Sequence, residues 1–111
     1  MIIYNVTVNI EKSIHDEWLI WIKNYIPLVL ATRKFTDAKL TKVLVEEEMG
    51  GATYAIQYSA KSREALDSYY KNDADKLNQD GLLKFADKML TFRTELEIID
   101  EYSITHHSEC L

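Results

Sequence analysis

The chain has 111 residues, a formal net charge of −5 and 47% hydrophobic residues. This length is typical of one domain, and one proline with three glycines argues against low complexity or disorder. The acidic balance, without any long Lys/Arg run, argues against phosphate-backbone binding, so we expect no nucleic-acid partner. No stretch approaches the roughly 18 to 20 apolar residues of a membrane span.

The single cysteine and the first residues bear on the compartment. Cys110 cannot form an internal disulfide, which fits a reducing cytoplasm. Residues 1–5 enter an alternating pattern directly, without a basic segment and a long apolar run, so no secretory signal is expected. We therefore expect a cytoplasmic protein with one domain over 1–104 and a flexible C-terminal tail over 105–111.

The first third of the chain predicts a strand and then a helix. Residues 2–10 alternate apolar and polar side chains, which predicts a half-buried strand. Ser13 is a candidate N-cap, so a helix is expected from about Ile14. Pro27 disfavours helical geometry at the preceding residue, which predicts a kink or break and a short turn over 28–32. The apolar stripe of this helix consists of Ile14, Trp18, Leu19, Trp21, Ile22, Tyr25 and Ile26.

The middle of the chain predicts a hairpin. Residues 38–46 and 53–59 alternate as strands do, and a charged loop with Gly50 and Gly51 lies between them. The period of two places Tyr54, Ile56 and Tyr58 on one face of the second strand.

The last part predicts helical material in two pieces and a final strand. Ser62 is the expected N-cap of a helix that carries Leu66, Tyr69 and Tyr70. Asn72 and Asp73 are expected to interrupt it, before a further helical stretch that reaches Met89 and has Gly81 as a weak point. The alternation over 92–102 predicts the last strand.

These elements predict an α+β fold of the ferredoxin-like βαββαβ type, with both helices on one face of a four-stranded antiparallel sheet. The helix side of the sheet is expected to contain Tyr4, Val6, Val8, Tyr54, Ile56, Tyr58, Leu96 and Ile98. The opposite face is expected to contain Ile3, Asn5, Thr7, Thr41, Val43, Val45, Gln57, Arg93, Glu95, Glu97 and Ile99.

No predicted element covers that opposite face, and its apolar residues would form a patch of the kind that marks an interface. A self-complementary patch closes as a symmetric pair, so we expect a homodimer formed sheet against sheet. The expected interface residues are Ile3, Asn5, Val43, Val45, Gln57, Arg93 and Ile99.

Several strings carry a family resemblance: Met1-Ile2-Ile3-Tyr4-Asn5-Val6-Thr7, Trp18 with Trp21, Ile26-Pro27, Ala31-Thr32, Glu47-Glu48-Met49-Gly50-Gly51 and Phe92-Arg93-Thr94-Glu95-Leu96-Glu97. They resemble an uncharacterised bacterial family of small proteins in the dimeric α/β-barrel group. The resemblance covers about 1–102 and implies a ferredoxin-like homodimer, but it supplies no known activity.

Two positions depart from the family pattern. Family members have histidine where Tyr25 stands, so Tyr25 puts any acid–base role of that position in doubt. They have glycine where Arg33 stands. Glycine after a helix commonly takes the left-handed conformation, which costs a residue such as arginine about 1 kcal/mol. We expect Arg33 to be slightly strained or the helix to end differently.

In the wider group, ligands often lie between the helices and the sheet, where some members oxidise aromatic substrates without a cofactor and others degrade haem. The plainest interpretation here is that the aromatic residues fill the core of a small domain. The alternative is a pocket for a small aromatic or apolar ligand. Its lining would be Trp18, Trp21, Tyr25, Tyr54, Tyr58, Tyr69 and Phe85, with Trp18, Trp21, Tyr69 and Phe85 as candidate ligand contacts.

The weak catalytic candidates are His15, Tyr25, Tyr54 and Tyr58. His15 is the only histidine in the region expected to fold, and it would act as a base only if it faced the cleft. The second helical half has no histidine, so haem ligation is not expected and we predict no cofactor.

The alternating charges Arg93, Glu95 and Glu97 fit cross-strand or cross-dimer ion pairs, and a small anion bound at Arg93 is the alternative. We predict no metal site. His106, His107, Glu109 and Cys110 are metal-ligand types, but they lie in the expected tail without a second spaced cluster. Glu46, Glu47 and Glu48 are better explained as a solvated loop.

The leading hypothesis is therefore a homodimeric module of unknown biochemical role that binds a small molecule between helices and sheet. A cofactor-independent monooxygenase-like enzyme is the alternative, and it needs a cavity large enough for a ring-sized substrate. A structural or regulatory subunit, whose surface matters more than its cleft, is the third hypothesis.

Overall fold

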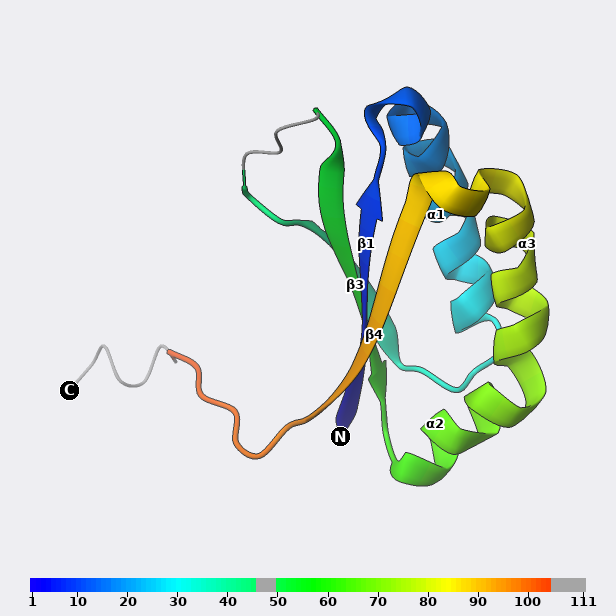
Figure 1. Ribbon diagram of the computed structural model, residues 1–111. Helices are drawn as coiled ribbons and strands as arrows, with labels where there is room; N and C mark the ends of the chain where they lie inside the picture. The colour runs from blue at the N-terminus through cyan, green and yellow to red at the C-terminus, as the bar shows by residue number, and fades with distance from the viewer. Residues whose placement is uncertain (46–49, 105–111) are drawn as a thin grey trace.

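Four strands form one antiparallel sheet in the order β2-β3-β1-β4. The computed structural model describes residues 1–45 and 50–104. All the helices lie on one face of the sheet (Figure 1), and the sheet is open, with β2 and β4 at its edges. The predicted ferredoxin-like fold is confirmed. The strands are β1 (Ile2–Ile10), β2 (Asp37–Lys42), β3 (Ala52–Ala60) and β4 (Met89–Glu97).

The helical elements begin in two different ways. Ser62 caps the second helix as predicted, because its Oγ accepts a hydrogen bond from the Ala65 amide at 3.1 Å. Ser13 does not cap the first helix, because it lies inside a short 3₁₀ turn that precedes the α-helix. The helical elements are η1 (Lys12–Ile14), α1 (His15–Leu30), α2 (Arg63–Tyr69), η2 (Tyr70–Ala74), α3 (Asp75–Phe85) and η3 (Ala86–Lys88).

Helix α1 does not break at Pro27, contrary to the sequence-based expectation. Pro27 lies inside the helix, which continues to Leu30. A proline cannot donate a hydrogen bond to the carbonyl four residues earlier, which here belongs to Lys23. Both residues are exposed, so water can satisfy that carbonyl. The last turn is held in the core by Val29, which is fully buried.

Helices α2 and α3 form one continuous helical stretch, so the predicted interruption at Asn72 and Asp73 is wrong. The π-helical segment η2 joins them instead. A π turn inserts one extra residue and rotates the following side chains about the helix axis. Ala74 is buried as a result, and Asn78 reaches the side of α3 that faces the sheet.

Strand β4 lies earlier in the chain than 92–102 and faces the opposite way from the prediction. Met89 is its first residue rather than part of a helix. Glu95 lies opposite the buried Tyr4, and Arg93 lies opposite Val6. Residues paired across two strands share a face, so Arg93 and Glu95 are on the helix side of the sheet. Leu96 is on the other side.

Five predicted placements on this strand are therefore wrong. Arg93, Glu95 and Glu97 were expected on the uncovered face, where Arg93 would have been an interface residue, but the register places all three on the helix side. Leu96 was expected to face the helices, and it lies on the uncovered face. Ile98 lies beyond the end of the strand, where its amide donates to the Met1 carbonyl at 3.0 Å.

Polar side chains of α2 and η2 explain why β4 can turn its charges toward the helices. The Arg63 guanidinium donates two hydrogen bonds to the Glu95 carboxylate, at 2.7 and 2.9 Å. The Tyr70 hydroxyl donates a third at 2.6 Å. The bonds from Arg63, and then the bond from Tyr70, lower the pKa of Glu95 to about 2. This network attaches the edge strand to the helical layer.

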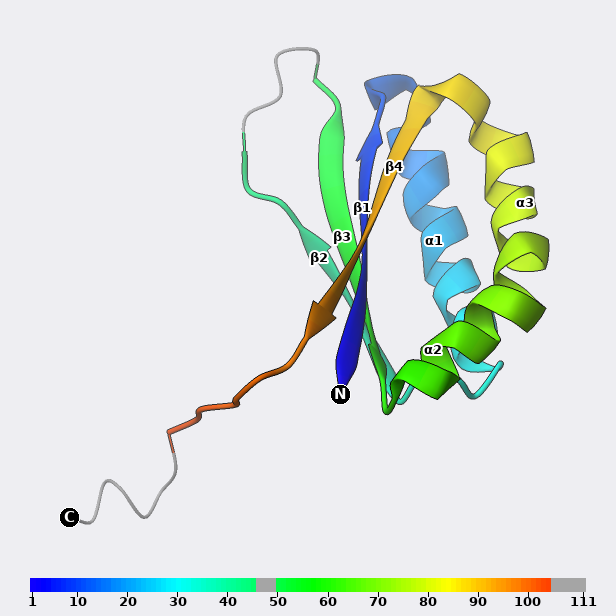
Figure 2. The same cartoon turned by 60° about the horizontal axis from the view of Figure 1, so that its bottom comes forward.

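The outer face is the side of the sheet that points away from the helices, and no other described segment covers it (Figure 2). The strand register confirms the predicted location of Ile3, Asn5 and Gln57 on this face. The apolar residues of β4 make it more apolar than predicted. Leu90 is 58% exposed, Phe92 60% and Leu96 42%.

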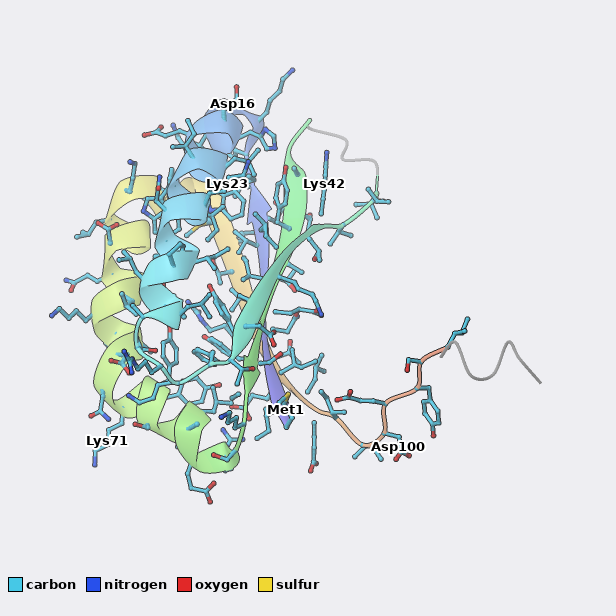
Figure 3. The ribbon with its side chains drawn as sticks, turned by 180° about the vertical axis from the view of Figure 1, so that it is seen from behind. Met1, Asp16, Lys23, Lys42, Lys71 and Asp100 are labelled. Atoms are coloured by element: carbon cyan, nitrogen blue, oxygen red, sulfur yellow. The ribbon has the colours of Figure 1, made fainter. Side chains whose placement is uncertain are left out.

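Several exposed residues lie away from the core of the sheet. Figure 3 shows Lys71 in η2 pointing away from the sheet. It also shows that the segment with Asp100 leads away from the sheet after β4. Val45 and Ile99, both expected at the interface, lie outside the strands and are 59% and 79% exposed.

The expected strain at Arg33 is confirmed, since its φ of 65° lies in the left-handed region. Replacing Arg33 by glycine should raise the free energy of unfolding by about 0.5–1 kcal/mol, because glycine takes the left-handed conformation without a steric cost. The greater entropy of glycine in the unfolded state offsets only part of this gain. Urea denaturation measures the change. Arg33→Ala is the control and should give no such gain. An equal gain in both variants would assign the effect to the side chain instead.

The Glu95 network should make stability depend on pH in acid. The pKa of Glu95 is lowered in the folded state from 4.5 to about 2, so its stabilisation is present above pH 4.5 and is lost as the pH falls toward 2. Glu95→Gln should lose less stability than the wild type across this range, as measured by urea denaturation at several pH values. Glu97→Gln, on the same strand, should behave as the wild type. Equal pH dependence in Glu95→Gln and wild type would contradict the assignment.

Candidate functional site

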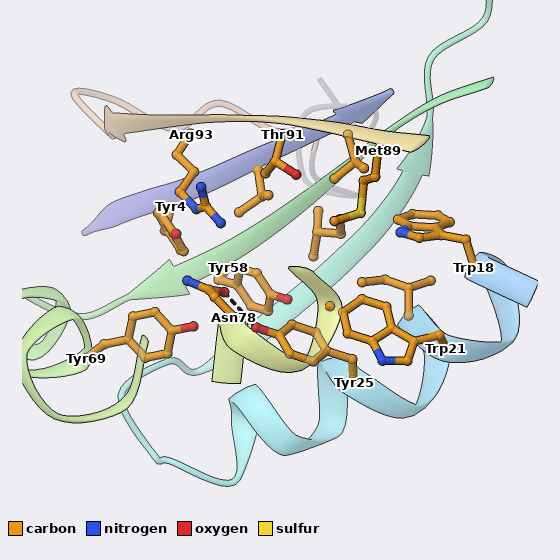
Figure 4. Close-up of a pocket in the computed structure, with 15 residues that line it drawn as sticks. Tyr4, Trp18, Trp21, Tyr25, Tyr58, Tyr69, Asn78, Met89, Thr91 and Arg93 are labelled. Atoms are coloured by element: carbon orange, nitrogen blue, oxygen red, sulfur yellow. Dashed lines mark hydrogen bonds between the residues drawn. The ribbon is translucent and has the colours of Figure 1, made fainter. Parts of the chain in front are cut away.

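A pocket lies between helices α1 and α3 on one side and strands β1, β3 and β4 on the other (Figure 4). We call it the helix–sheet pocket. It encloses a cavity of about 50 Å³. Arg93 lines the pocket and is exposed to solvent, so the pocket reaches the surface beside it. It is lined by Tyr4, Val6, Val8, Trp18, Trp21, Ile22, Tyr25, Ile56, Tyr58, Tyr69, Asn78, Gly81, Met89, Thr91 and Arg93.

Close contact between α1 and α3 forms the wall on the helix side. The rings of Trp21 and Tyr25 stack with their centroids 4.6 Å apart. A Cβ atom on Gly81 would lie 2.8 Å from the Trp21 ring, so only glycine permits this approach of α3. The Trp21 indole N–H also donates to the Asp80 carboxylate at 3.0 Å. Gly81 is therefore a packing position rather than the weak point expected from sequence.

Phenol groups supply most of the polar lining. The Tyr25 hydroxyl donates to the Asn78 side-chain oxygen at 2.9 Å, which leaves the Asn78 amide nitrogen as a donor. Burial raises the pKa values of Tyr4, Tyr25, Tyr58 and Tyr69. These four phenols are therefore protonated at neutral pH and act as hydrogen-bond donors rather than as bases.

Arg93 is the cation of this pocket. Figure 4 shows its side chain extending from β4 toward Tyr4 and Asn78. Its positive charge opposes the burial-driven rise of the pKa at Tyr4, Tyr25 and Tyr69, so it acts on all three hydroxyls. Among the described residues, no carboxylate forms an ion pair with it.

One buried polar group of the wall has no hydrogen-bond partner among the described residues. The indole nitrogen of Trp18 is buried and forms no hydrogen bond within the described part of the chain. A buried N–H without a partner costs free energy, so native structures rarely retain one without a reason. Figure 4 shows this nitrogen on the side of the ring nearest Met89, which is another lining residue. A bound molecule or a water in the cavity would explain it.

Three of the four candidate ligand contacts line the pocket. Trp18, Trp21 and Tyr69 line the pocket together with the catalytic candidates Tyr25 and Tyr58. The sequence reasoning missed Asn78 and Thr91, and it placed Arg93 on the wrong face. Asn78 could not be found because the π turn changes the helical phase before it.

Three predicted site residues lie elsewhere. Phe85 is buried but does not line the pocket, and its ring packs edge-on against Trp21 at 5.5 Å. His15 and Tyr54 form a separate pair, in which His15 Nε2 lies 2.7 Å from the Tyr54 hydroxyl. His15 Nδ1 lies 3.3 Å from the carboxylate of Asp16, which is fully exposed. His15 therefore does not face the helix–sheet pocket.

Other expectations concern metal ions and membranes. His106, His107, Glu109, Cys110 and the loop residues Glu46, Glu47 and Glu48 lie outside the described residues. Within 1–45 and 50–104, no group of three metal-ligand side chains is placed to hold an ion. Across the same residues, no helix combines the length and the apolar character needed to cross a bilayer.

Residues 1–99 match the family model described as "Domain of unknown function (DUF4286)". The chain belongs to this family. The predicted resemblance to an uncharacterised family is thereby confirmed. Comparison of this DUF4286 chain with curated proteins gives no match.

Solved structures share the fold of this DUF4286 chain. A dimeric ferredoxin-like protein from an uncultured marine organism matches with a TM-score of 0.57 and 10% identity, over 91% of this chain and 98% of that one. A putative antibiotic biosynthesis monooxygenase from Deinococcus radiodurans matches with a TM-score of 0.60 and 15% identity, over 95% and 99%. A de novo designed protein with a ferredoxin fold matches with a TM-score of 0.51 and 19% identity, over 96% of each chain. These likenesses establish the fold alone.

Proposed function

We propose that this protein is a homodimeric module that binds a small molecule in the helix–sheet pocket. The observation that carries the proposal is a cavity with apolar walls into which a few polar groups converge, which is the usual composition of a ligand site. These groups include the Arg93 guanidinium, which forms no ion pair with a described carboxylate, and the buried Trp18 indole N–H, which has no hydrogen-bond partner among the described residues. A pocket that only completed the core would not leave the Trp18 N–H unpaired.

Binding is favoured over the monooxygenase-like alternative by the size and chemistry of the pocket. The cavity of about 50 Å³ is smaller than the roughly 150 Å³ of an engineered apolar cavity that binds benzene. The structural neighbour from Deinococcus radiodurans is described as a putative monooxygenase, and it supports the alternative only through the fold. The phenols here are protonated, and His15 is engaged with Tyr54 outside the pocket.

The dimer is proposed to form through the outer face. Its exposed apolar residues on β4 would lie against the same residues of a second copy around a twofold axis. A structural neighbour with this fold is described as dimeric. Asn5 is less available for a bond across the interface than expected, because its amide donates to Thr7 Oγ1 at 3.2 Å within the chain.

Phe92→Asp should therefore convert the protein to a monomer, because it places a charge in the apolar patch that the proposed dimer would bury. Light scattering after size-exclusion chromatography at micromolar concentration gives the mass. Leu83→Asp is the matched control, since Leu83 is 77% exposed on α3, away from the outer face, and it should leave the mass unchanged. A wild-type mass of one chain would refute the dimer.

Small-molecule binding is testable by tryptophan emission, because both tryptophans of the chain line the pocket. We expect the emission to respond to at least one of four small probes: propanoate, propanamide, propanol and propylamine. Thr91→Phe should abolish the response, because the added ring fills the cavity. Lys76→Phe adds the same ring to an exposed position on α3 and should leave the response intact.

Thr91→Val keeps the space and removes only the hydroxyl, so it separates filling of the pocket from loss of a polar group. It should respond as the wild type does. Unfolding curves establish that each variant is folded. A wild-type protein that responds to none of the four probes, or a Thr91→Phe variant that responds unchanged, would refute the proposed function.

A further inference from the structure

We propose that the ligand of the helix–sheet pocket is a small monocarboxylate whose acid group is bound by Arg93 and whose apolar part enters the enclosed cavity. This inference rests on the proposed function and names the class of molecule that the same pocket selects. Three observations support it: the Glu95 carboxylate on β4 is already engaged, hydrogen-bond donors surround Arg93, and the rest of the pocket wall is apolar.

The nearest acidic candidate for Arg93 along its own strand is already engaged. Glu95 lies two residues further along β4 on the same face, where it could neutralise Arg93. Both oxygens of its carboxylate instead accept hydrogen bonds from Arg63, and one of them also accepts from Tyr70. Arg63 is further held by Asp67 at 2.9 Å. Arg93 is hydrogen-bonded to the Tyr4 hydroxyl but forms no ion pair with a described carboxylate, so its charge is left for an anion.

The surroundings of Arg93 are suited to an anion. Tyr4 and Tyr69 line the same pocket, and burial raises the pKa values of their hydroxyls, so both stay protonated. The Tyr4 oxygen accepts a hydrogen bond from Arg93, which leaves the Tyr4 proton to donate, whereas the Tyr69 hydroxyl is already hydrogen-bonded to Tyr25. Asn78 offers its amide nitrogen, because its oxygen already accepts the bond from Tyr25. A guanidinium with neutral O–H and N–H donors is the environment that stabilises a carboxylate through charge-assisted hydrogen bonds.

The rest of the pocket limits the ligand to a monoanion with a short apolar part. Arg93 is the only cationic side chain in the lining, so a doubly charged phosphate would be left half neutralised. Beyond it the described wall is aliphatic and aromatic, with Val8, Ile22 and Met89 as examples. The enclosed volume of about 50 Å³ admits only a few atoms. A longer molecule would have to extend out through the opening beside Arg93.

The test compares propanoate with its neutral isostere propanamide, using tryptophan emission. Propanoate should bind the wild type about tenfold or more tightly than propanamide, because only the acid forms charge-assisted bonds. Arg93→Gln should remove this preference, and Arg93→Lys should retain part of it, because lysine keeps the charge without the planar pair of donors. Arg33→Gln removes an exposed arginine outside the pocket and should keep the full preference.

The outcomes separate the two proposals. Equal affinity for propanoate and propanamide in the wild type, with Thr91→Phe abolishing both, would overturn the carboxylate assignment and leave the proposed function standing. An unchanged preference in a folded Arg93→Gln variant would also overturn the assignment. Loss of every response in the wild type would overturn the pocket function itself. Inorganic phosphate, added as a competitor, should displace propanoate weakly, and strong displacement would overturn the choice of a monocarboxylate.

Discussion

The register of the antiparallel pairing between β4 and β1 determines which side chains of β4 lie on each face of the sheet. With Glu95 opposite Tyr4, the charged residues of β4 point to the helices and its apolar residues point outward. A slip of one residue would reverse every side chain of the strand. Arg93 would then leave the pocket, and Phe92 would leave the outer face. The proposed ligand site and the proposed dimer surface therefore depend on the same strand register.

The helical layer reinforces this register from a distant part of the sequence. Arg63 and Tyr70 reach Glu95 from α2 and η2, which precede β4 in the chain and are separated from it by α3. The π turn that contains Tyr70 also sets the phase of α3, so that Asn78 and Gly81 face the sheet. One local irregularity thus contributes to the anchoring of β4 and to the lining of the pocket. π turns are frequently found at functional sites for this kind of reason.

Sequence patterns were sufficient for elements whose signals are local. The alternation in β1 and β3 and the Ser62 cap follow from a few neighbouring residues. The left-handed Arg33 was indicated instead by the glycine that the resembled family has at this position. Sequence patterns failed where contacts with residues distant in the sequence determine the structure. The alternation in β4 alone is compatible with either of its two faces pointing toward the helices. The contacts of Arg63 and Tyr70 with Glu95 determine which face it is. Pro27 indicated a break, but the burial of Val29 and an exposed backbone carbonyl allow the helix to continue.

For the same reason, only part of the candidate site could be predicted from the sequence. Trp18, Trp21 and Tyr69 were predicted from helical spacing, which places them on apolar faces regardless of any ligand. The polar groups that give the pocket its character come from a strand whose facing was misjudged and from a helix whose phase was shifted. No local pattern separates a phenol that fills a core from one that lines a cavity.

The position of β4 at the edge of the sheet gives its charges a further consequence. An edge strand has one row of backbone N–H and C=O groups without a strand partner, and such a row can recruit strands from other molecules into aggregates. Charged side chains that point inward from an edge strand oppose such strand addition, because a docking chain would bury them. Arg93, Glu95 and Glu97 are placed to oppose such strand addition at β4, independently of any ligand.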